Sequence, residues 1–272
     1  MAMSNPAFGK RSFPVANTGS TSAMVLNGTT MTPEKLDELY GRPSATPTET
    51  NRMSYEDTIM KTVISLVFVI IGAVVGFTFP VLALPFALVG FVLALVNIFK
   101  KQPSAPLVLA YSVAQGVFVG GLSYIVQLNA PGIIFQALVG TAAVFGVTLA
   151  LFANGKVRES KRATKIFLIA GVSYALLSVV NLVLQLTGVL TTPWGINGTD
   201  IPGTNIPFGL IIGPLAILMG AYSLVMDFTS VKQGVEQGAP RNWGWKAAFG
   251  ITLTILWLYV EILRLISIFR SN

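Results

Sequence analysis

Two carboxylates near the C-terminal end of the sequence are the side chains best suited to do chemistry. Asp227 and Glu261 lie in or beside the last two of seven long apolar stretches, and the other five contain no acid. An ionisable group in hydrocarbon costs roughly 2.5 to 3.5 kcal/mol on insertion scales, so such groups usually face water or one another and mark an ion path. The pattern therefore predicts a functional site that contains both residues.

The chemistry of such a site follows from the two acids. Carboxylates that lie close together away from water cannot both ionise at low cost, so they share a proton or bind a cation. Carboxylates with water suit calcium or magnesium. We predict Asp227 and Glu261 as gating residues and ligands of a transient divalent metal ion, calcium or magnesium, with no resident cofactor and no catalytic residue.

Two structural interpretations of the acids stay open beside this one. Asp227 could be a boundary residue that headgroups or cytoplasm solvate. Glu261 could form an ion pair with Arg264, which follows it by three residues and lies one helical turn away. The same arginine could also hold the carboxylate closed when no cation is present, so Arg264 joins the predicted gating residues.

The sequence contains no Cys and no His. Their absence removes thiolate and imidazole ligands for zinc, copper or iron and excludes Cys–His and Ser–His nucleophilic catalysis. Intramembrane aspartyl proteolysis needs two catalytic aspartates, and only Asp227 is in place. We therefore expect that the protein is not an enzyme, and that any response to pH near neutrality comes from carboxylates.

Seven apolar stretches would position these side chains, because each has about the 20 residues that a helix needs to cross hydrocarbon. Of 272 residues, 53% are hydrophobic and only 11% are charged, as is typical of a polytopic membrane protein. We expect an all-α integral membrane protein, a seven-transmembrane-helix bundle. The predicted helices cover residues 59–79, 81–99, 106–127, 131–153, 164–187, 207–227 and 247–269.

Residues 1–54 have a different composition, rich in Ser, Thr, Pro, Asn and Gly without a sustained hydrophobic period. Such a segment buries too little apolar area to offset its chain entropy. We predict a disordered cytoplasmic tail over residues 1–54 and a membrane domain over residues 55–272. A short helix over residues 33–39 is a weaker expectation, with Pro33 at its first position.

Lysine and arginine occur in alternate loops, ten in all, and the other three loops contain none. The positive-inside rule then places the N-terminus in the cytoplasm and the short tail with Arg270 outside. The same rule explains the net charge of +7 better than nucleic-acid binding does. The ten residues are Lys100, Lys101, Lys156, Arg158, Lys161, Arg162, Lys165, Lys232, Arg241 and Lys246.

Small and polar residues inside the apolar stretches predict helix packing. Two Gly-xxx-Gly pairs have the spacing that lets helix backbones approach closely in lipid, and polar side chains are expected to form hydrogen bonds between helices. The glycine pairs are Gly72 with Gly76 and Gly116 with Gly120, and the polar residues are Tyr111, Gln115, Gln136, Asn181 and Tyr222.

The end of the sixth helix sets the depth of the two acids. The run Gly238-Ala239-Pro240 should stop that helix, because glycine ends helices and proline cannot continue them. Counted from this turn at 1.5 Å per residue, Asp227 lies about 16 Å and Glu261 about 22 Å deep. The two carboxylates are thus expected within a turn or two of each other.

Short motifs surround the acids, and others lie at the first and third helices. Together they span roughly residues 54–270. They are Tyr55-Glu56-Asp57, Ala114-Gln115-Gly116-Val117-Phe118-Val119-Gly120, Gly220-Ala221-Tyr222, Leu224-Val225-Met226-Asp227-Phe228, Gly238-Ala239-Pro240 and Trp257-Leu258-Tyr259-Val260-Glu261-Ile262-Leu263-Arg264.

In these motifs the chain resembles the Bax inhibitor family of bacterial YccA-like membrane proteins, with the transmembrane Bax-inhibitor motif, in its actinobacterial-type branch. The resemblance implies a multi-pass protein of the bacterial plasma membrane and a pH-sensitive passive calcium leak beside the last helix. Its two gating carboxylates correspond here to Asp227 and Glu261. Relatives often have Asp at the second position and an acid where Gln115 stands, and an early gating arginine of some relatives has no match, which leaves Arg264 as its substitute.

The alternative is a non-conducting membrane regulator, because relatives are also associated with restraint of a membrane protease and with stress survival. The predicted tail could present itself to such a membrane protein. Deletion of residues 1–50 separates the two hypotheses, since a leak would persist and a tail-mediated interaction would be lost.

Overall fold

The computed structural model describes residues 24–26, 29–31, 51–192 and 194–271. The chain divides into two units, residues 1–46 and 47–272. In the first, strands β1 (Met24–Leu26) and β2 (Thr29–Met31) pair antiparallel. The other residues before residue 51 lie outside the described residues, so the predicted disordered tail and the short helix over 33–39 stay predictions.

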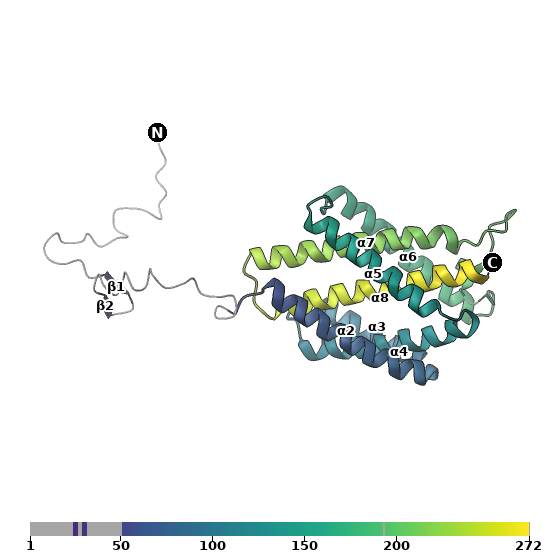
Figure 1. The fold of residues 1–272 in the computed structure, drawn as a ribbon, viewed down its shortest axis with the longest axis horizontal. Helices are drawn as coiled ribbons and strands as arrows, with labels where there is room; N and C mark the ends of the chain where they lie inside the picture. The colour runs from purple at the N-terminus through teal and green to yellow at the C-terminus, as the bar shows by residue number, and fades with distance from the viewer. Residues whose placement is uncertain (1–23, 27–28, 32–50, 193, 272) are drawn as a thin grey trace. The chain divides into compact units, whose positions relative to one another are not determined.

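The second unit is a bundle of seven helices that are long and apolar enough to cross a membrane, counted over the described residues. They match the seven predicted stretches and confirm a multi-pass helical membrane protein, whose many exposed apolar side chains are suited to a lipid environment. The helices in Figure 1 are α2 (Tyr55–Thr78), α3 (Ala83–Phe99), α4 (Ala105–Asn129), α5 (Ile133–Ala153), α6 (Lys161–Leu186), α7 (Gly209–Glu236) and α8 (Trp243–Ser271), with short 3-10 helices η2 (Pro80–Leu82) and η3 (Gly195–Gly198).

Local sequence signals set the helix ends. The hydroxyl of Ser54 caps α2 by accepting a hydrogen bond from the backbone N–H of Asp57 at 3.2 Å. Pro80 opens the 3-10 turn between α2 and α3, because it lacks the N–H that would continue α2. As predicted, α7 runs past Asp227 to Glu236 and ends before Gly238, whose φ of +64° suits a residue without a side chain.

Helix α8 occupies the centre of the bundle and packs against α2, α4, α5 and α7 (Figure 1). Helix α6 differs from α8 in its environment, because no residue of α6 is buried. Helix α8, which carries Glu261, is therefore the most enclosed of the seven helices, and α6 is the least enclosed.

The contact between α2 and α4 is formed by the two predicted glycine pairs. A Cβ atom on Gly76 would collide with the carbonyl of Val117 in α4, and one on Gly120 would collide with the carbonyl of Ala73 in α2. The other glycine of each pair is similarly close to the opposite backbone. The predicted close helix approach is thus confirmed.

Replacing Gly76 by alanine is expected to destabilise this contact, because the new methyl group would meet the carbonyl of Val117. Overpacking of this kind costs about 1–3 kcal/mol. The matched control is Gly146→Ala in α5, where a Cβ atom meets no atom within 4 Å. The midpoint of thermal unfolding in detergent micelles should fall for the first variant only, and equal midpoints would contradict the close packing.

Candidate functional site

Glu261 is almost completely buried inside the bundle, with only 3% of its surface exposed. Its carboxylate forms an ion pair with the guanidinium of Arg264, one turn later on α8. The hydroxyl of Tyr174 on α6 donates to Oε1, and the indole N–H of Trp257 donates to the same oxygen at 3.2 Å. Both carboxylate oxygens are thus satisfied, as a charge at membrane depth requires.

Arg264 is 8% exposed and completes this cluster. Its Nη1 donates to the hydroxyl of Tyr174 at 2.9 Å, so the tyrosine contacts both members of the ion pair. Among the described residues, Nε of Arg264 has no partner. The predicted ion pair between Glu261 and Arg264 is therefore present, and Tyr174 ties it to α6.

Asp227 lies on α7 and points its carboxylate at α8. Oδ2 accepts a hydrogen bond from the hydroxyl of Thr254 at 2.8 Å, and that hydroxyl lies 3.2 Å from the hydroxyl of Ser223. Oδ1 lies against Gly250, where a Cβ atom would come within 2.9 Å of it. Small residues of α8 thus make room for the carboxylate, and Asp227 is partly buried against this helix.

The two carboxylates contact the same helix and do not contact each other. Thr254, the partner of Asp227, is seven residues from Glu261, which is two turns or about 10 Å along α8. Between these levels Leu258 is fully buried and packs into α7 at Gly220. Within the described residues no hydrogen bond joins the two acids, so the arrangement is two separate acidic positions, without a directly shared proton.

Tyr174 and Thr254 are the site residues that sequence reasoning missed. A tyrosine or threonine within an apolar helix usually finds a hydrogen-bond partner, and that was the available signal. Helix α6 gives no hydrophobic periodicity that would indicate which side faces α8, so the partner of Tyr174 could not be chosen from the sequence.

The predicted polar contacts between helices are found only in part. The hydroxyl of Tyr222 on α7 lies 2.9 Å from the hydroxyl of Thr164 on α6, as expected. The side chain of Asn181 instead accepts from the N–H of Ile196 in η3 at 2.7 Å. In the described part of the chain, three of the predicted side chains form no hydrogen bond: Tyr111, which packs edge-on against a phenylalanine, Gln115 and Gln136.

A sequence model of the family described as Bax inhibitor 1 like matches residues 5–271. The chain belongs to the Bax inhibitor 1-like family. The family predicted from the motifs around the acids is therefore confirmed, and the match includes all seven helices of this Bax inhibitor 1-like protein. A search of curated proteins found no match to the chain.

The donors around the acids limit how an ion could bind. Within the described ranges, no three acidic, histidine or cysteine side chains cluster. At Asp227, the hydroxyl of Thr254 contacts the carboxylate, the hydroxyl of Ser223 contacts that of Thr254, and water would supply the remaining ligands of an ion. At Glu261, a cation would have to compete with the guanidinium of Arg264.

Removing the positive charge of Arg264 alone is expected to destabilise the protein more than removing both charges. Arg264→Met leaves the carboxylate of Glu261 buried without its positively charged partner, which costs about 3–5 kcal/mol. The double variant with Glu261→Gln buries no charge and should recover most of this loss. Thermal unfolding of the wild type, both single variants and the double variant measures the coupling, and additive single effects would contradict it.

Proposed function

We propose that this Bax inhibitor 1-like protein is a pH-sensitive passive cation leak, with calcium as the ion, in which Glu261 and Asp227 bind the passing cation. The observation that carries the proposal is the ion pair of Glu261 and Arg264 at the centre of an apolar bundle. Ionisable groups inside membrane helices are costly and commonly belong to ion or proton paths.

The proposed path follows α8 past two acidic levels. Asp227 would be one position and Glu261 the next, about 10 Å further along the helix. The contact of Leu258 with Gly220 lies between these positions and would interrupt the path in the closed state. In that state Arg264 occupies the carboxylate that a cation would need.

Opening would require the guanidinium of Arg264 to leave Glu261. Helix α6 is suited to such a movement, because no residue of this helix is buried and Tyr174 attaches it to the ion pair. A displacement of α6 would remove one partner from each charge and would lower the cost of separating them.

Protonation would oppose conduction in this proposal. A neutral carboxyl group attracts a divalent cation weakly, so the flux is expected to fall as the pH is lowered. The distribution of lysine and arginine favours a plasma-membrane orientation with the N-terminus in the cytoplasm, which we include in the proposal.

Calcium flux into proteoliposomes that contain a trapped fluorescent indicator tests the proposal at two pH values. Glu261→Gln and Asp227→Asn each remove a cation ligand and should lower the flux by about tenfold, as a rise of about 1.4 kcal/mol in the barrier would do. Both should also weaken its pH dependence. The control is Asp200→Asn in the exposed loop before α7, which should leave the flux unchanged.

Unchanged flux in both acid variants would remove these residues from the mechanism. Absence of flux from the wild type, with the protein correctly inserted, would instead favour the non-conducting regulator. In that case deletion of residues 1–50 and capture of membrane partners would test the tail, which lies largely outside the described residues.

Loosening α6 should have the opposite effect on flux. Tyr174→Phe removes the hydroxyl that contacts Glu261 and Arg264 but leaves their ion pair, so the flux should rise. Tyr124→Phe is the matched control, because within the described residues the hydroxyl of Tyr124 makes no hydrogen bond and its ring packs on Phe77. Equal flux in the two variants would contradict the proposal that the hydroxyl of Tyr174 holds α6 against the ion pair in the closed state.

A further inference from the structure

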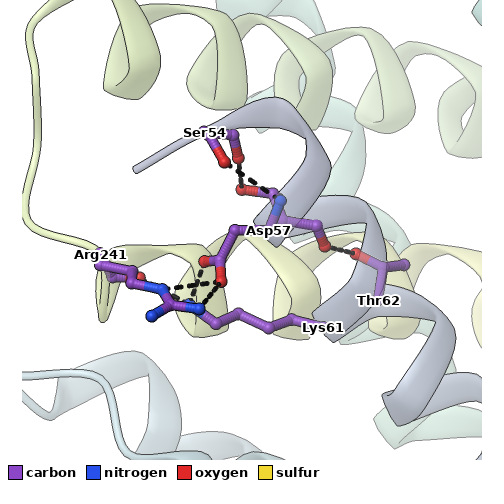
Figure 2. A network of polar contacts seen from close by, with 6 residues as sticks. Ser54, Asp57, Lys61, Thr62 and Arg241 are labelled. Carbon is purple, nitrogen blue, oxygen red and sulfur yellow. Dashed lines mark hydrogen bonds and ion pairs between the residues drawn. The ribbon is translucent and has the colours of Figure 1, made fainter. Parts of the chain in front are cut away.

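A second charged cluster lies where the start of α2 meets the turn between α7 and α8. Figure 2 shows Lys61 and Arg241 approaching the carboxylate of Asp57 from these two elements. Lys61 pairs with Oδ2, and Nε and Nη2 of Arg241 each lie 2.9 Å from Oδ1. The ammonium of Lys61 also donates to the backbone carbonyl of Arg241 at 2.7 Å and lies 5.6 Å from the centroid of the Trp245 ring.

The charges of this cluster do not cancel. Two cations, Lys61 and Arg241, face one carboxylate, that of Asp57, which leaves a net charge of +1. Lys61 is only 8% exposed, and its ammonium is occupied by the carboxylate, the carbonyl and the indole ring. The surplus positive charge is therefore presented by Arg241.

Arg241 has an unused hydrogen-bonding edge. Its side chain is 49% exposed and binds Asp57 through Nε and Nη2. Within the residues that the structure describes, Nη1 has no partner, so Nη1 and the second hydrogen of Nη2 form an open fork. A guanidinium fork fits two oxygens of a carboxylate or a phosphate.

Arg241 lines a surface cavity of about 650 Å³, and no acidic residue is part of its wall. Asn51 and Asn242 also line it, and their side-chain amides form no hydrogen bond within the described part of the chain. The wall is held in place by backbone bonds, because the N–H of Arg241 donates to the carbonyl of Asn51 at 3.0 Å. The full lining is Asn51, Lys61, Pro240, Arg241, Asn242 and Trp245.

The position of the cavity indicates where its ligand comes from. It lies where the apolar part of α2 begins, beside Trp245, and tryptophan concentrates at the membrane–water interface. Ile59, Met60 and Val63 expose apolar side chains along the same turns of α2, where lipid chains would contact them. The loops with the ten lysines and arginines belong to this end of the bundle, which therefore attracts anionic lipid.

We propose that this cavity binds the phosphate group of an anionic phospholipid. The open fork of Arg241 would bind two phosphate oxygens, and the amides of Asn51 and Asn242 would donate beside it. Asp57 is a positioning residue, because it fixes the guanidinium from behind, and Lys61 holds Asp57 in turn. A bound lipid would join the start of α2 to the turn before α8 and so would stabilise the bundle.

The test measures binding of phosphatidylglycerol to the full-length protein in detergent, by titration and by the shift of the thermal midpoint. Arg241→Gln should weaken binding by about tenfold or more, as expected for loss of a charge-assisted bidentate contact. Arg162→Gln removes one exposed arginine at the same end of the bundle and should leave binding within about twofold of the wild type. Equal weakening by both variants would overturn the proposal, because it would indicate only diffuse attraction.

Arg241→Gln also removes the ion pair with Asp57, so Asn242→Ala serves as a second variant that leaves this pair in place. Its side chain lies outside the Asp57 network, so its thermal midpoint without lipid should equal that of the wild type while the lipid affinity falls. An unchanged lipid affinity in both Arg241→Gln and Asn242→Ala would refute the site. The last measurement replaces the lipid by inorganic phosphate. If phosphate alone raised the thermal midpoint as much as phosphatidylglycerol does, the assignment to a phospholipid would be overturned.

Discussion

The structure depends on one constraint, which is that a charge inside a membrane must have its partners within the protein. The buried carboxylate of Glu261 is satisfied by Arg264 and Trp257 from its own helix and by Tyr174 from α6. Helix α8 packs against four other helices, which shield the side chains at its centre from lipid. The placement of α8 and the burial of its ion pair are therefore one feature of the fold.

The bundle combines a rigid contact with a loose one. Backbones of α2 and α4 meet through the two glycine pairs, where even a methyl group has no room. Helix α6 has no buried residue and is attached through the hydroxyls of Tyr174 and Tyr222 and through Asn181. Helix α6 is thus less enclosed than the α2–α4 contact, which is the difference on which the proposed gating movement of α6 rests.

The two ion clusters differ because their surroundings differ. The cluster of Glu261 and Arg264 balances its charges within the apolar bundle, where a surplus would be costly. The cluster around Asp57 lies at the end of the bundle and carries one positive charge more than it balances. Water and lipid headgroups can compensate that surplus. The cluster around Asp57 is therefore suited to bind an anion, whereas the pair of Glu261 and Arg264 is suited to keep a buried charge neutralised.

The sequence by itself determined the seven helices, the end of α7 before Gly238 and the glycine pairs that allow close helix approach, because apolar length, proline, glycine and small-residue spacing act locally along the chain. It also offered the pairing of Glu261 with Arg264 as one interpretation, since residues three apart lie about one helical turn from each other, and the structure contains this pair. Only the tertiary structure decided that Tyr174 joins this pair, that Asp227 stands two turns away and that Lys61 is buried beside Arg241. The physical reason is that a helix in lipid is apolar on every side, so hydropathy does not tell which face meets which neighbour.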